Sequence, residues 1–148
     1  MSLHWTLTPF HELTVDQLYK IIQLRIAVFV VEQQCNFQDA DDKDPKAWHI
    51  CCWDEDNLAA YSRILPPGIS YKEASIGRVL TAKNFRGKKI GKELMQQSIE
   101  AVYQLFGKTS IQIGAQLYLK KFYEEFGFKK NGEVYLEDNI PHIKMILS

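Results

Sequence analysis

A short basic loop is the segment of this chain whose residue types most directly suggest chemistry. It reads Arg86-Gly87-Lys88-Lys89-Ile90-Gly91-Lys92 and lies between an apolar, strand-like run and a helical pattern of apolar residues. The first N–H groups of a helix lack intrahelical acceptors, the helix dipole makes that end positive, and glycine lets an anion approach the backbone. We therefore interpret residues 86–92 as a binding site for a pyrophosphate, to which the arginine and lysine side chains add positive charge.

An ordinary strand-to-helix connection with solvated lysines is the alternative interpretation of this loop. Two better known phosphate motifs do not match it. The Walker pattern requires a wider spacing than that from Gly87 to Gly91, and a Ser or Thr directly after the lysine, where this chain has Glu93. The dinucleotide fingerprint G-x-G-x-x-G is absent.

Composition and charge limit the class of protein. The 148 residues include 18 basic and 18 acidic side chains, so the formal net charge is zero, and 46% of the residues are hydrophobic. These values predict one globular domain over residues 1–148 and argue against a nucleic-acid binder. The N-terminus lacks a signal-peptide layout and no apolar run is long enough to cross a membrane. We expect a cytoplasmic protein that binds neither membranes nor nucleic acid.

The cysteines argue against disulfides and against a metal site. There are three, Cys35, Cys51 and Cys52, and no C-x-x-C pair. An odd count without pairing motifs indicates a reducing environment. Adjacent cysteines in a strand point to opposite faces, so Cys51 and Cys52 are poorly placed to bind one ion together with His49. We predict that the protein holds no metal.

Apolar periodicity predicts the elements that position the basic loop. Strands are expected at residues 3–7, 48–53, 58–65, 74–81, 109–115, 134–136 and 143–147, and helices at about 14–30, 90–106 and 117–126. Thr14 and Gln17 have the spacing of a capping box, and Gly107 is a helix stop. The predicted order is β-α-β-β-β-α-β-α-β-β, an α/β fold in which a mixed central sheet is flanked by helices.

Two groups of residues resemble a known family. The strand followed by Arg86-x-x-x-x-Gly91, the next strand ending at Gln116, and the run from Phe122 to Phe128 resemble the GCN5-related N-acetyltransferase (GNAT) superfamily. The N-terminal half is similar to the ElaA branch of that superfamily in the residues Leu24-Arg25, Glu32-Gln33, Asp41-x-x-Asp44 and Ala47-x-His49. The resemblance covers nearly the whole chain and implies a single GNAT-like domain.

The resemblance implies acetyl-CoA as cosubstrate. The loop amides then hold its pyrophosphate, an exposed strand edge pairs with its pantetheine arm, and Tyr123 is the acid that serves the leaving thiolate. The implied cofactor-binding residues are Val79, Leu80, Thr81, Arg86, Gly87, Lys88, Lys89, Ile90, Gly91, Lys92 and Gln116. Lys89 replaces a family glycine, and we expect it to adopt the backbone conformation of a helical first turn. For Tyr123 the alternative is a core tyrosine on an amphipathic helix.

Several residues are candidates for the base that deprotonates the amine. His49 is the first candidate, because histidine has a suitable unperturbed pKa, about 6.5. Glu32 or Asp41, acting through water, are further candidates, and His142 ranks behind His49. The alternatives are a hydrogen-bonded strand histidine for His49 and a solvated loop for the acidic run around Asp41.

The function implied by the resemblance is acetyl transfer from acetyl-CoA to the primary amine of a small molecule or peptide, directly within a ternary complex. The alternative is a non-catalytic, CoA-binding regulatory module with the same fold. The acceptor amine is not encoded in any readable motif, and the oligomeric state is open, with a homodimer as the candidate.

Overall fold

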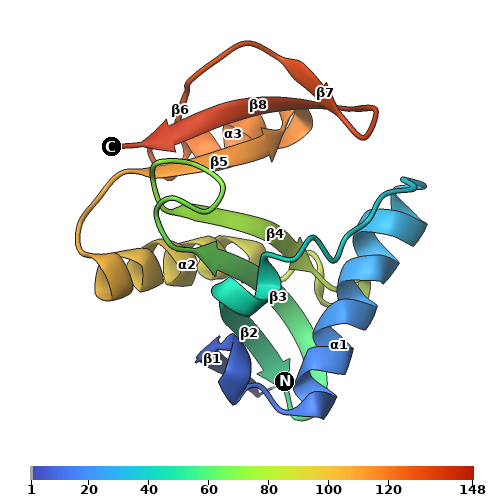
Figure 1. The fold of residues 1–148 in the computed structure, drawn as a ribbon. Coiled ribbons are helices and arrows are strands. Elements are labelled where there is room, and N and C mark those ends of the chain that lie inside the picture. The colour runs from blue at the N-terminus through green and yellow to red at the C-terminus, as the bar shows by residue number, and fades with distance from the viewer. Residues whose placement is uncertain (1) are drawn as a thin grey trace.

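The computed structural model describes residues 2–148, which form two antiparallel sheets and three α-helices (Figure 1). The N-terminal sheet has the strand order β1-β2-β3-β4. Its strands are β1 (Leu3–Pro9), β2 (Trp48–Asp54), β3 (Asn57–Leu65) and β4 (Ser75–Thr81). The second sheet consists of β5 (Ile111–Gln116), β6 (Lys129–Lys130), β7 (Tyr135–Glu137) and β8 (Ile140–Leu147). Strand β8 lies between β5 and β6 and also pairs with β7.

Strands β2 and β3 are buried on both faces, since helices cover the N-terminal sheet on both sides. Helix α1 (Val15–Arg25) covers one face and helix α2 (Ile90–Phe106) the other. Cys51 packs in the cluster of α1, whereas Cys52 packs in the cluster of α2, as the alternation of a strand predicts. All three cysteines are free and buried.

Helix α1 begins as its sequence predicts but changes its geometry before it ends. Thr14 Oγ1 accepts from the Gln17 N–H at 3.1 Å and Gln17 Oε1 accepts from the Thr14 N–H at 2.9 Å, which confirms the capping box. From Ile26 to Glu32 the chain continues as a π-helix. Such wider turns are frequent at functional sites, and Gln33, directly after this one, lines the cleft described below.

Within residues 2–148, one isolated β-bridge pairs the two sheets. Ala74, just before β4, pairs with Ile111 at the start of β5 in a parallel bridge, and the Gln112 N–H donates to the Ala74 carbonyl at 3.0 Å. Beyond it, β4 pairs only with β3, and β5 only with β8, within residues 2–148. The facing edges of β4 and β5 are therefore unpaired.

The mixed α/β class and the predicted element order are confirmed, with three differences. The sheet is split in two instead of continuous, and the short strand β6 was not predicted. The third helix is shorter than expected, because a 3₁₀ turn at Leu117–Leu119 precedes α3 (Lys120–Glu124). Among the helices of residues 2–148, none has the length and apolar character needed to cross a membrane.

Candidate functional site

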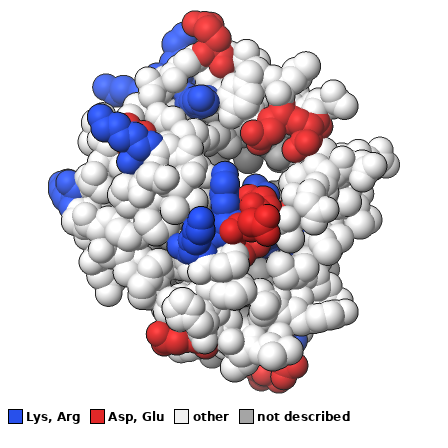
Figure 2. All heavy atoms as spheres, in the orientation of Figure 1, with Lys and Arg blue, Asp and Glu red and all other residues white. Residues whose placement is uncertain are grey.

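A cleft of about 520 Å³ opens between the diverging strands β4 and β5. Gly77, Arg78 and Val79 line it from β4. Gly114 and Gln116 line it from β5. Figure 2 shows basic and acidic side chains next to each other around a hollow on this face.

A β-bulge at Arg78 makes β4 diverge. Arg63 of β3 pairs with Gly77, but Tyr61, two residues earlier, pairs with Leu80, so β4 has an extra residue between these pairs. Arg78 has φ 51°, a left-handed conformation that non-glycine residues rarely adopt. Bulges bend a strand and increase its twist. The bulge thus turns the end of β4 away from β5 and leaves residues 79–81 without a strand partner on that side, although the Thr81 carbonyl accepts from Arg86.

The Arg78 conformation is held by ion pairs to residues 39–44, which we call the acidic loop. Its Nε donates to Asp39 Oδ1 at 2.8 Å, and its Nη2 donates to the Asp39 carbonyl at 3.0 Å and to Asp41 Oδ2 at 3.3 Å. The acidic loop therefore fixes the shape of β4.

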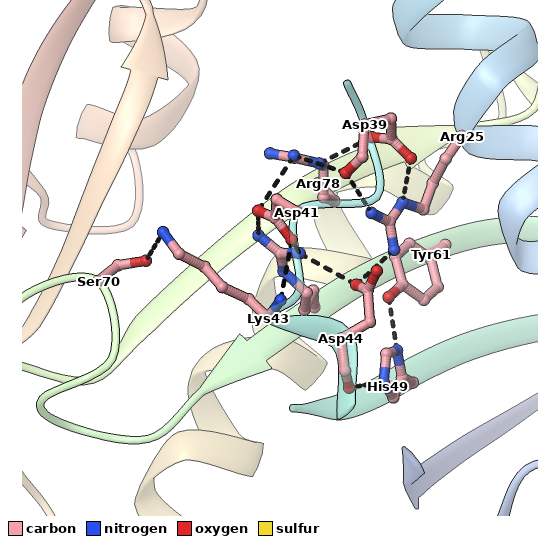
Figure 3. Close-up of polar contacts among 10 residues, drawn as sticks. Arg25, Asp39, Asp41, Lys43, Asp44, His49, Tyr61, Ser70 and Arg78 are labelled. Carbon is pink, nitrogen blue, oxygen red and sulfur yellow. Dashed lines mark hydrogen bonds and ion pairs between the residues drawn. The ribbon is translucent and has the colours of Figure 1, made fainter. Parts of the chain in front are cut away.

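Three arginines neutralise the three aspartates of this network (Figure 3). Arg25 is fully buried and donates to Asp39 at 2.8 Å and to Asp44 at 2.6 Å. Arg63 donates to both oxygens of Asp41, at 2.7 and 2.9 Å. The alternative of a solvated acidic loop does not hold for these three aspartates, because arginines engage their carboxylates. Within residues 2–148, no group of three or more His, Cys, Asp or Glu is placed to hold a metal ion.

Asp41 is a poor proton acceptor in this setting. Burial tends to raise its pKa, but the hydrogen bonds from Arg63 and the charges of Arg63 and Arg78 outweigh that effect and lower the pKa to about 2. Glu32 is similarly engaged, since the hydrogen bond from Arg86 holds its pKa below the usual value.

His49 lies away from the cleft, in the buried interior. Its Nδ1 is 2.6 Å from the Tyr61 hydroxyl and its Nε2 is 3.1 Å from the Asp44 carbonyl, so both ring nitrogens are occupied (Figure 3). Because a carbonyl only accepts, Nε2 carries the proton and Nδ1 accepts from Tyr61. Burial lowers the pKa of His49. The structure thus gives His49 the environment of a hydrogen-bonded strand histidine.

Tyr123 and His142 both line the cleft. Tyr123 is 6% exposed, and burial, with a smaller contribution from Tyr118, raises its pKa, so the phenol is protonated at neutral pH. His142 of β8 was ranked behind His49 from sequence. The pairing of β8 with β5 brings it to the cleft, and a tight turn at Asp138 and Asn139, both with positive φ, joins β7 to β8. Asp and Asn tolerate positive φ, so this pair was a turn signal in the sequence.

The basic loop has free backbone donors. Within residues 2–148, nothing accepts a hydrogen bond from the N–H groups of residues 87–92. Helix α2 starts at Ile90, and an ideal Cβ on Gly91 lies 3.5 Å from Thr81 Oγ1, so the loop adjoins the end of β4. Arg86 Nε donates to the Thr81 carbonyl at 3.1 Å, which ties the loop to the same strand.

Lys89 does not adopt the expected conformation. It is the N-cap of α2 with φ 62° and ψ 15°, the left-handed region, so the prediction of a helical first-turn backbone is wrong. Glycine adopts this conformation without steric cost, whereas an L-residue loses about 1–2 kcal/mol. The Lys89 side chain is exposed, as expected.

An amide pair crosses the cleft. Gln116 Nε2 donates to Gln33 Oε1 at 3.2 Å, and Gln33 Nε2 donates to Gln116 Oε1 at 3.5 Å. Gln33 follows the π-helix and Gln116 ends β5, so this pair joins the N-terminal helix to the second sheet. Gln116 was among the predicted cofactor-binding residues, whereas Gln33 was not.

Comparison with known proteins gives consistent matches. The pattern of the family described as Acetyltransferase (GNAT) domain matches residues 23–148. Protein ElaA of Escherichia coli (strain K12) is 43% identical over 145 residues, which cover 97% of this chain and 95% of ElaA. The crystal structure of Escherichia coli ElaA has a TM-score of 0.93 to this chain and covers 99% of it and 100% of its own chain, at 41% identity. An acyl-CoA N-acyltransferase from Pseudomonas aeruginosa has a TM-score of 0.95, at 39% identity, and covers 99% of this chain and 100% of its own.

Proposed function

This chain belongs to the acetyltransferase (GNAT) family, and we propose that it transfers the acetyl group of acetyl-CoA to the primary amine of a small molecule or peptide. The similarity to the ElaA branch inferred from sequence is confirmed. The fold of the family supports acyl transfer from an acyl-CoA to nitrogen in general. The observation that carries the proposal for this chain is the cleft between β4 and β5, with Tyr123 inside it and free backbone donors where β4 ends.

The pyrophosphate binds the N–H groups of residues 87–92. These donors lie at the positive end of α2, which has 17 residues and therefore a developed dipole. Four basic side chains contribute to the potential there: Arg86, Lys88, Lys89 and Lys92. Arg86 already pairs with Glu32, so its charge is shared between the carboxylate and the phosphates.

The pantetheine arm extends from the loop into the cleft along β4. Thr81 is next to Gly91, and Val79, two residues earlier on the same strand, lines the cleft. The open backbone edge of Val79, Leu80 and Thr81 offers donors and acceptors to the amides of the arm, as an exposed strand edge does for a peptide. Gln116 borders the opposite wall.

The reaction is direct attack of the amine nitrogen on the thioester carbonyl carbon, followed by cleavage of the carbon–sulfur bond. The Tyr123 hydroxyl donates a hydrogen bond to the sulfur as negative charge develops there. Because the pKa of Tyr123 is raised, the phenol is a weaker acid than a thiol, and hydrogen bonding to the sulfur is its main contribution. The sulfur then receives the proton that the nitrogen loses when the amide forms.

The direct test is release of free thiol from acetyl-CoA across a panel of amines that includes small amines, amino acids and lysine-containing peptides. Thiol release that depends on an amine, with a mass increase of one acetyl group on that amine, is the expected result. Calorimetry with CoA, run in parallel, separates the alternatives. Binding of CoA without turnover on any amine would favour the non-catalytic regulatory module, and absence of binding would refute both.

A further inference from the structure

His142 lines the cleft, and its Nε2 makes no hydrogen bond within residues 2–148. Strand register puts His142 opposite Gln116 of β5 on one side and Tyr135 of β7 on the other, so the three form a row across the sheet. Its side chain is 9% exposed, and the residue lines the cleft together with Tyr123 and Gln116. The cleft is therefore the open space available to this ring.

The hydrogen bonds of the ring determine its tautomer. Nδ1 lies 2.7 Å from the Ile140 carbonyl. A carbonyl oxygen only accepts, so Nδ1 donates and carries the proton of the neutral ring. Nε2 then holds the lone pair, which is the form that a proton acceptor requires.

Glu137 is placed to stabilise the protonated ring. Its Oε2 lies 3.6 Å from Nε2. A carboxylate cannot donate to the lone pair of Nε2, but it attracts the same nitrogen once that nitrogen binds a proton. Within residues 2–148, Glu137 forms no ion pair except with His142, and Asp138, which also lines the cleft, forms none. These two carboxylates give the part of the cleft next to His142 a negative potential, which suits the ammonium group of an acceptor.

On the basis of the proposed function, we propose that Nε2 of His142 removes a proton from the acceptor ammonium group, with Glu137 as the positioning residue. The N–H bond of the ammonium breaks and an N–H bond forms at Nε2, giving an imidazolium next to the Glu137 carboxylate. The neutral amine attacks the thioester carbon, and the electron pair of the carbon–sulfur bond leaves with sulfur. A second proton passes from nitrogen to sulfur, and the imidazolium returns its proton to water.

Other charged groups around the cleft bear on this proton transfer. Arg63 and Arg78 face the cleft from β3 and β4, but both are paired with the acidic loop. Lys43 donates to Ser70 Oγ at 2.8 Å and has no carboxylate partner within residues 2–148. Burial raises the pKa of the remaining phenols, and they stay neutral: Tyr71, Tyr123 and Tyr135.

A purely structural role in the β7–β8 hairpin is the alternative for His142, and the experiment separates the two. His142→Gln keeps a polar side chain but removes the base, and we expect kcat to fall about 100-fold or more while the Kd for CoA is unchanged. The acidic limb of the pH profile of kcat/KM should disappear. Glu137→Gln should lower kcat less than His142→Gln does and leave the Kd for CoA unchanged, because the base remains but loses the neighbouring carboxylate. His11 is exposed and does not line the cleft, so His11→Gln is the matched control and should retain the wild-type rate and profile.

Wild-type kcat and an unchanged acidic limb in His142→Gln would overturn the inference and leave the proposed function intact. Failure of the wild-type protein to release thiol would instead refute the proposed function, and with it the need for a base. A second measurement does not depend on a folded variant or on a known acceptor. ¹⁵N NMR of labelled histidine in the wild-type protein should show His142 protonated at Nδ1, and protonation at Nε2 alone would contradict the inference.

Discussion

Arg86 donates two hydrogen bonds to Glu32, at 2.8 and 3.0 Å, and so joins the end of the π-helix to the loop before α2. The side chain of Arg86 is 40% exposed and that of Glu32 is 42% exposed. An exposed pair of this kind contributes at most about 1 kcal/mol. Glu32 thus competes only weakly with the phosphates of CoA for the charge of Arg86.

Glu32→Gln should consequently strengthen CoA binding by about two- to fivefold, since it removes a competing charge worth no more than about 1 kcal/mol. Isothermal calorimetry at low and high salt measures the change, which should shrink as salt increases. Glu12→Gln removes an exposed carboxylate elsewhere and is the control. Weaker binding by Glu32→Gln would mean that the carboxylate positions Arg86 for the phosphate instead of competing with it.

Tyr123→Phe should lower kcat about 100-fold, because loss of one preorganised donor to a developing charge has an effect of that size. The Kd for CoA should not change, as the phenol acts only when charge develops on sulfur. Steady-state kinetics and calorimetry measure the two quantities. Tyr19→Phe is the control: it removes a hydroxyl from a tyrosine that is 69% exposed and should not change the rate. An unchanged rate in Tyr123→Phe would exclude Tyr123 from the reaction.

Gly91→Asp should weaken CoA binding by at least about 100-fold, because it places a carboxylate beside the diphosphate. Gly91→Asn has nearly the same shape without the charge and should bind much more tightly than the aspartate variant. Gly91→Ala should retain binding, since its Cβ meets only Thr81 Oγ1 at an ordinary contact distance of 3.5 Å. Retained affinity in Gly91→Asp would show that the phosphates bind elsewhere.

Lys89→Gly should raise the free energy of unfolding by up to about 1 kcal/mol. Relief of the left-handed backbone conformation is worth about 1–2 kcal/mol, and the greater freedom of glycine in the unfolded chain offsets part of it. Lys88→Gly removes the same charge from a residue whose φ is not positive, so it should not be stabilising. Urea unfolding compares the two variants, and equal stabilities would contradict the conformational explanation.

Asp41→Asn should reduce stability at neutral pH but not in strong acid. The folded pKa of Asp41, about 2, is below its ordinary value of 3.8, so its contribution is complete above the ordinary value and is lost as pH falls through 2. Allowing for solvent screening, we expect a difference of about 1–2 kcal/mol from the wild type at neutral pH. Urea unfolding at several pH values should show the two proteins converging as the carboxylate of the wild type is protonated.

Local patterns were sufficient to predict most of the fold. The capping box at Thr14, the apolar stripe of α2 and the stop at Gly107 depend only on neighbours within a few residues, and all three appear in the structure. The resemblance added an exposed strand edge and the residues Val79, Gln116 and Tyr123, which line the cleft. The bulge at Arg78 could not be predicted, because its unusual backbone conformation depends on ion pairs to residues 37 and 39 positions earlier in the chain.

The environments of His49 and His142 also depend on contacts between distant segments of the chain. His49 was favoured because the ordinary pKa of histidine suits a base, but the strand turns its side chain into the interior toward Tyr61. The aspartates of that loop are neutralised by arginines from α1, β3 and β4, which no local pattern reveals. His142 lines the cleft because β8 pairs with β5, a contact between segments well separated along the chain.

The amide pair of Gln33 and Gln116 has a bearing on how kinetic data from this protein are to be read. Neither side chain ionises between acid and alkaline conditions, and neither has a net charge that dissolved ions could shield. This contact across the cleft should accordingly hold equally well across the titration range. A dependence of turnover on pH therefore does not arise from the loss of this contact.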